Sequence, residues 1–220
     1  MRYFFWLVQQ SNEHISTKAA QAFLSANMHV QKHIRIFVVF CVVIFLFNAL
    51  SPAMKRLVLI RHAKSSWDDG AISDFDRPLN ARGQHDAPRM GAWLREKGIT
   101  PDLIYSSPAQ RALSTARLIA HETGYSLADI ITKDILYRFD NELLPIIECV
   151  KNSADSAQSI FLFGHNETFT YLANHFTQHR IDHVPTCGVV CFRFVTDTWH
   201  SFDKTSAALD FVQFPKQLPL

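Results

Sequence analysis

The sequence predicts an α/β protein built on a doubly wound, mostly parallel sheet with helices on both faces. Three short apolar segments carry this prediction, at residues 57–60, 103–105 and 160–163. Continuous apolar runs of this length are typical of strands covered on both faces, as in parallel sheets. Stretches with helical periodicity lie between them, and this alternation indicates a doubly wound sheet.

The other elements follow from apolar periodicity and from capping residues. We expect one helix after Asn80 that ends before Gly98, and another that ends at Gly124, because Asn caps helix starts and Gly ends helices. Ser107 is the predicted N-cap of the second helix, and Pro108 its first residue. The remaining predicted elements are a strand over 130–137, a helix over 140–150, a helix from Asn166 to about His175, and strands over 188–195 and 209–214.

Each of the three buried strands leads to a basic or imidazole side chain. Arg61 and His62 follow the first strand, His165 follows the third, and Arg111 falls in the first helical turn after the second. The carboxyl ends of strands in an open α/β sheet face the ligand crevice, where helix N-termini also attract anions. Arg61 and His62 alone would suit an ordinary surface loop, but three such strand ends favour an anion site. Residues 64–75, polar and acidic, are predicted to form a loop over it.

Charge and cysteine content narrow the function classes. Residues 1–53 hold four of the 22 Lys and Arg and one of the 20 Asp and Glu, so the remainder has 18 basic and 19 acidic residues. The remainder therefore has no basic stripe of the kind a nucleic-acid partner requires. The four cysteines form no Cys-x-x-Cys pair, so nothing requires an oxidising compartment.

The N-terminal hydrophobic extension, residues 1–53, allows three interpretations. Its apolar run, 36–47, is shorter than the roughly 18–20 residues of a membrane span. Read from Met28, it resembles a secretory signal. Residues 34–50 could instead form a single membrane anchor, with the rest of the chain on the cytoplasmic side. The third interpretation, which we favour, is that Met54 is the true first residue, which leaves a cytoplasmic domain over 54–220.

Four sequence blocks together resemble a known family. They are RHAKSSW at 61–67, DRPLNARG at 76–83, SSPAQRA at 106–112 and GHN at 164–166. In this order they resemble the histidine phosphatase superfamily, which has the phosphoglycerate-mutase-like fold, and are most similar to the small SixA-type phosphohistidine phosphatases.

The resemblance implies a catalytic role for four residues. It implies that His62 forms a covalent phosphohistidine that water hydrolyses, and that His165 contacts the phosphoryl group. Arg61 and Arg111 are the candidate phosphate clamp, because guanidinium forks match phosphate geometry and keep their charge. Asn166 and Ser65 are further candidate phosphate ligands. The expected chemistry uses no metal and no cofactor, since positioned cations stabilise the charge of a transferring phosphoryl group.

Departures from the family pattern bear on the substrate. Asp68 stands about where phosphoglycerate mutases place a phosphate-binding asparagine, and a carboxylate there disfavours mutase activity. Ala63 replaces a frequent glycine, and the general-acid glutamate of larger members has no clear match, Glu142 being the nearest acidic residue. A phosphohistidine leaving group needs less help from an acid than an alkoxide, which favours a phosphoramidate substrate.

The sequence therefore predicts a phosphatase that acts on a phosphorylated protein through a covalent intermediate on His62. The alternatives are a small-molecule phosphomonoesterase acting on a phosphorylated metabolite and a non-catalytic module that recognises phosphorylated partners. The histidines at 175, 179 and 183 could suggest a metal site, but without a neighbouring Cys or carboxylate ligand an exposed helix end is the favoured interpretation.

Overall fold

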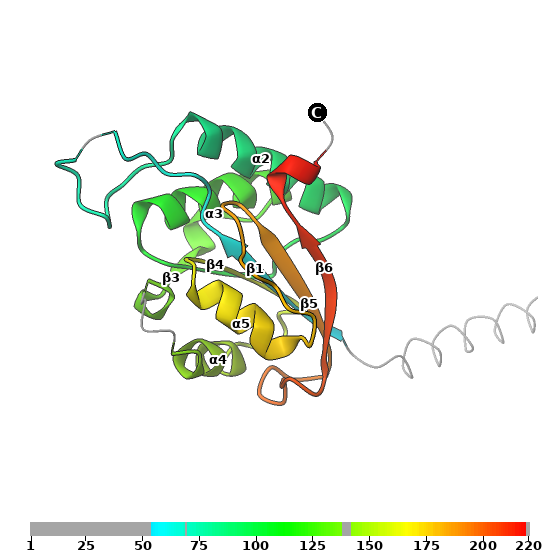
Figure 1. Ribbon diagram of the computed structural model, residues 1–220. Helices are drawn as coiled ribbons and strands as arrows, with labels where there is room; N and C mark the ends of the chain where they lie inside the picture. The colour runs from blue at the N-terminus through cyan, green and yellow to red at the C-terminus, as the bar shows by residue number, and fades with distance from the viewer. Residues whose placement is uncertain (1–53, 69, 138–141, 219–220) are drawn as a thin grey trace, which may run out of the picture. The chain divides into compact units, whose positions relative to one another are not determined.

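One six-stranded sheet organises the part of the chain that the computed structural model describes, residues 54–68, 70–137 and 142–218. The expectations for residues 1–53 lie outside these ranges. The strand order is β3-β2-β4-β1-β5-β6 (Figure 1). β1 (Met54–Arg61) pairs in parallel with β4 (Ser159–Gly164) on one side and antiparallel with β5 (Val189–Val195) on the other.

The outer strands complete a mixed sheet. β2 (Leu103–Ser106) runs parallel to both β4 and β3 (Ile131–Thr132), whereas β6 (Ala207–Gln213) runs antiparallel to β5. The predicted mostly parallel α/β sheet is therefore confirmed. The strand predicted over 130–137 is wrong in extent, because the chain leaves β3 after two residues and forms a 3-10 turn at Asp134–Leu136.

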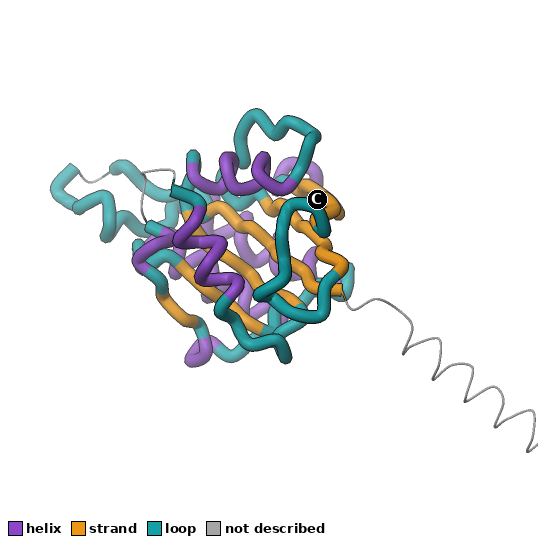
Figure 2. The backbone as a smooth tube through the Cα atoms, turned by 90° about the horizontal axis from the view of Figure 1, so that it is seen from below, coloured by secondary structure: helices purple, strands orange, loops and turns teal. Residues whose placement is uncertain are grey.

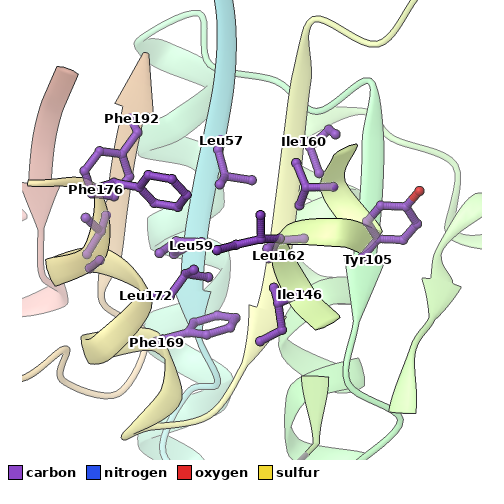
Figure 3. Packing of buried hydrophobic residues seen from close by; sticks show 14 of the residues in the cluster. Leu57, Leu59, Tyr105, Ile146, Ile160, Leu162, Phe169, Leu172, Phe176 and Phe192 are labelled. Atoms are coloured by element: carbon purple, nitrogen blue, oxygen red, sulfur yellow. The ribbon is translucent and has the colours of Figure 1, made fainter. Parts of the chain in front are cut away.

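Two helices cover each face of the sheet, as Figures 1 and 2 show. α2 (Ala81–Glu96) and α3 (Gln110–Thr123) pack on the face that receives Val58 and Ile60. α4 (Leu144–Lys151) and α5 (Thr168–Phe176) pack on the face that receives Leu57 and Leu59 (Figure 3). This alternation follows from the two-residue period of a strand, and burial on both faces explains the unbroken apolar run of β1.

The helix ends agree with the predicted caps in part. Asn80 caps α2, its side-chain oxygen accepting a hydrogen bond from Gly83 N at 3.0 Å, and Gly124 ends α3 in the left-handed conformation, φ 76°. The predicted Ser107 N-cap is wrong: Ala109 immediately precedes α3, and the Ser107 hydroxyl accepts from Ala109 N at 3.3 Å and also binds His165. α5 begins at Thr168, two residues after Asn166.

In the described ranges, every helix is too short or too polar to cross a bilayer.

Replacing a sheet residue that is buried between β1 and β2 should lower stability strongly. Phe161 is fully buried in β4, so Phe161→Ala should reduce the free energy of unfolding by roughly 3–5 kcal/mol, because the cavity adds to the lost apolar burial. Urea unfolding followed by circular dichroism measures this. The control, Val195→Ala at a position 55% exposed, should change it by less than about 1 kcal/mol; equal effects would contradict the assigned packing.

Candidate active site

The register of β1 against β4 places two histidines side by side. Arg61 pairs with Gly164, so His62 and His165 each follow the last paired position of their strand. The His62 backbone N–H donates to Gly164 O at 3.0 Å, and the two imidazole rings lie 5.1 Å apart between centroids. Ser107 leaves β2 next to them, its N–H donating to Phe163 O at 2.8 Å. Three strand ends thus meet at one site.

The tautomer of His62 follows from its hydrogen bond. Its Nδ1 lies 2.8 Å from the carbonyl oxygen of Ala63. A carbonyl only accepts, so Nδ1 carries the proton and Nε2 keeps a lone pair. His62 as a whole is 8% exposed. In this tautomer the basic ring nitrogen of His62 is Nε2.

His165 is held between Ser107 and Arg111. Arg111 Nη2 donates to its Nδ1 at 3.2 Å, which leaves the proton on Nε2, and Nε2 donates to Ser107 Oγ at 2.8 Å. Arg111 is buried at the start of α3. Thr115, one turn later, accepts from Ala63 N at 2.9 Å and so ties α3 to the end of β1.

Arg61 lies at the edge of the same site. Its Nη1 donates to Val184 O at 2.8 Å, and its buried Nε has no hydrogen-bond partner within the described residues. Burial, then repulsion from Arg111, lowers the pKa of the Arg61 guanidinium. The two guanidinium groups therefore face a shared region that favours an anion.

The loop after β1 brings a carboxylate and a third arginine that the sequence did not single out. Asp74 Oδ2 accepts from Arg111 Nη2 at 3.0 Å and from the Tyr137 hydroxyl at 3.2 Å. Asp74 Oδ1 accepts from Arg77 Nη2 at 2.8 Å, and its carbonyl also binds Arg111. Arg77 lies in the DRPLNARG block, so that resemblance was the one signal that could have found it. The predicted loop over the site is present, and its Asp74 carboxylate binds Arg77 and Arg111.

The weaker phosphate-ligand candidates have other partners. Ser65 is buried and its Oγ accepts from Arg77 Nη1 at 2.6 Å, so it supports a cation of the site. Asn166 Oδ1 accepts from Thr170 Oγ1 at 3.2 Å, inside the start of α5. Asp68 is exposed and accepts from Ser66 Oγ at 2.5 Å.

No group of three or more His, Cys, Asp or Glu side chains in the described ranges is arranged to hold a metal ion. The cations that the site offers an anion are arginines of the chain itself.

Sequence comparison identifies the family. A family model described as the histidine phosphatase superfamily (branch 1) matches residues 57–137. An uncharacterised chloroplastic protein of Arabidopsis thaliana is 30% identical over 160 residues, which cover 69% of this chain and 73% of that protein. The chain belongs to the histidine phosphatase superfamily.

Other superfamily members match over different lengths. Phosphoglycerate mutase 1 of Saccharomyces cerevisiae is 40% identical over 67 residues, only 30% of this chain and 27% of the mutase. The crystal structure of SixA from Agrobacterium tumefaciens, a proposed phosphohistidine phosphatase, matches 73% of this chain and 99% of its own, with 26% identity and a TM-score of 0.58. The predicted SixA-type resemblance is thus confirmed.

The structure explains why the second of the four sequence blocks, residues 76–83, ends in a glycine. Asn80 N donates to Lys64 O at 3.0 Å, which brings the first turn of α2 against the chain leaving β1. A Cβ on Gly83 would lie 2.2 Å from that same carbonyl oxygen. Only glycine fits there without moving the backbone two residues after His62.

Both site histidines of this superfamily member are neutral at ordinary pH. Burial, and then the positive charge of Arg111 and its neighbours, lowers the pKa of His62 to about 3, although its bond to Ala63 acts the other way. Burial and the proximity of His62 lower the pKa of His165 to about 2. Partial burial raises the pKa of the Asp74 carboxyl, but Arg77 and Arg111 more than offset this, so its pKa lies below the ordinary value.

The two imidazoles should therefore resist protonation. A nuclear magnetic resonance titration of the folded protein should show His62 and His165 unchanged from pH 8 to 5, with His62→Gln assigning the signals. Because unfolded histidine has a pKa near 6.5, the unfolded state binds protons that these sites refuse, so they make stability fall as pH drops from about 7 towards 3. A folded-state transition near 6.5 in either ring would contradict this.

Removing the charge of Asp74 should free the arginines for an external anion. Asp74→Asn should tighten binding of orthovanadate roughly 3- to 10-fold, the effect of one partly exposed ion pair, measured by calorimetric titration. Asp76→Asn is the matched control, because Asp76 is on the same loop and binds Ser73 Oγ at 2.6 Å. Weaker vanadate binding by Asp74→Asn would instead mean that Asp74 positions Arg111.

Proposed function

We propose that this chain is a protein phosphohistidine phosphatase of SixA type, with Nε2 of His62 as the nucleophile. The observation that supports the proposal most is the state of His62. It is a neutral imidazole whose Nδ1 proton is bound by the Ala63 carbonyl, which leaves the lone pair on Nε2. A neutral imidazole is a competent nucleophile towards phosphorus, and covalent capture divides one difficult displacement into two easier ones.

The proposed reaction has two steps. In the first, the Nε2 lone pair of His62 forms a bond to phosphorus while the phosphorus–nitrogen bond to the substrate imidazole breaks, and the released ring nitrogen takes a proton from solvent water. In the second, water attacks phosphorus and gives up a proton to solvent, and His62 leaves with the electron pair of its bond to phosphorus, releasing inorganic phosphate. Arg61 and Arg111, with Arg77 behind them, spread the charge that develops on the phosphoryl oxygens.

The ionisation of Asp74 favours a phosphoramidate over an alkyl phosphate ester. Asp74 is the carboxyl that contacts Arg111, and the two arginines around it keep it charged. A carboxylate in that state has no proton to give to a departing alkoxide. An imidazole leaving group on an already labile bond requires less protonation, so the site suits phosphohistidine better.

The proposed role of His165 is to position the phosphoryl group. In the structure both of its ring nitrogens bind protein groups, Ser107 and Arg111. A phosphoryl group that draws Arg111 away from Asp74 would lie beside His165, since Arg111 contacts both. Arg111 is thus the group that we expect to exchange an internal carboxylate for the substrate.

The test is turnover of a phosphohistidine protein in the presence of a chelator. The full chain should release inorganic phosphate from it, and His62→Ala should lose roughly 10³-fold or more of kcat/KM, as for removal of a covalent nucleophile. His200→Ala, an exposed histidine outside the site, is the control and should retain activity. Quenching turnover with an alkaline denaturant should leave phosphate bound to the wild-type chain only, and later acidification should release it.

Other outcomes would replace the proposal. Turnover of p-nitrophenyl phosphate with none of phosphohistidine would indicate a small-molecule phosphomonoesterase. Binding of the phosphorylated protein without release of phosphate would indicate a recognition module. Full activity of His62→Ala would overturn the assigned nucleophile.

A further inference from the structure

A groove of about 770 Å³ adjoins the site through Arg61. Its cationic side chains come from four separate parts of the chain: Arg61 and Lys64 at the end of β1, Arg82 in α2, Arg180 before β5, and Lys216 in the 3-10 turn η3 (Pro215–Gln217). We call this feature the basic groove. Because Arg61 lines it and also flanks His62, a chain lying in the groove has one end at the phosphoryl site.

The charge of the basic groove is only partly neutralised. Arg180 pairs with Asp182 at 3.2 Å, but both side chains are 87% exposed, so this pair contributes little. Arg82 binds Asp86 at 3.2 Å. Arg61, Lys64 and Lys216 have no carboxylate partner within the described residues. Positive charge is therefore available along the groove beyond what one phosphoryl group would use.

Between these cations the lining is mixed, with apolar side chains beside the polar Asp182, His183 and Thr186. Ile181, Val212 and Phe214 contribute side chains to the same groove. One inorganic phosphate ion is too small to contact all of these cations at once and has no apolar group, whereas a peptide offers apolar groups and several carboxylates along its length. The mixture of apolar surface and separated cations is the complement of an acidic peptide segment.

We propose that the basic groove binds acidic residues next to the phosphohistidine of a protein substrate. This inference rests on the proposed function and adds the sequence context that the substrate carries. The catalytic residues select the phosphorylated imidazole, and the groove selects the chain around it. A phosphohistidine flanked by Asp or Glu on one side should be dephosphorylated faster than the same site in a neutral sequence.

The experiment uses the full chain and three phosphohistidine peptides, with three Glu before the histidine, three Glu after it, or Gln at all six positions. One acidic peptide should exceed the neutral one in kcat/KM by roughly 10-fold at low salt, and the advantage should shrink at high salt because exposed charges are screened. Lys216→Glu and Arg180→Glu should each reduce that advantage roughly 3- to 10-fold. The matched control Lys97→Glu, an exposed lysine outside the groove, should keep it.

Binding is measured separately, so that the two proposals can fail independently. The same peptides carrying a non-hydrolysable phosphonate analogue of phosphohistidine are titrated by fluorescence anisotropy. If no peptide is hydrolysed but acidic analogues still bind in a Lys216-dependent way, the proposed function is wrong and the proposal that the basic groove binds acidic residues is supported. Equal rates and affinities for all three peptides, or an equal loss by Lys216→Glu on free phosphohistidine, would overturn the groove.

Discussion

The parallel pairing of β1 with β4 is the constraint on which the site depends. It sets Arg61 opposite Gly164, so the next residue of each strand is a histidine and the two rings lie 5.1 Å apart. A slip of one residue in either strand would turn its side chains to the other face and separate the imidazoles. Leu57 and Val58 pack on opposite sides of the sheet, so such a slip would also exchange side chains between the two apolar layers.

The concentration of positive charge around the two imidazoles is the second organising feature. Three arginines surround imidazoles that burial keeps neutral. The arginines would repel one another without a nearby anion, and the Asp74 carboxylate supplies that negative charge. Because the Asp74 side chain remains 45% exposed, it is held by the arginines and not by packing. Asp74 therefore balances the arginine charge while its side chain stays accessible to solvent.

The strands, most helices and the four residues His62, Arg61, Arg111 and His165 could be predicted from the sequence, because short apolar runs and the four blocks are local signals. Contacts between residues far apart in the sequence could not be predicted in this way. Ser107 was expected to cap a helix, but a histidine 58 residues away takes its hydroxyl. Asp74 looked like one acidic residue in a polar loop, and nothing local says that this loop folds back onto Arg111. The strand at 130–137 was overestimated, since apolar residues there pack without extending the sheet.

The close contact between the Gly83 backbone and the Lys64 carbonyl limits which substitutions position 83 can accept. The first turn of α2 packs directly on the backbone carbonyl of Lys64, two residues after His62, with no side chain between them. A side chain added at position 83 must be accommodated by moving either the helix or the chain that leaves β1. Gly83 therefore constrains the backbone next to His62, and a substitution there would disturb the arrangement of the site in a protein that is still folded.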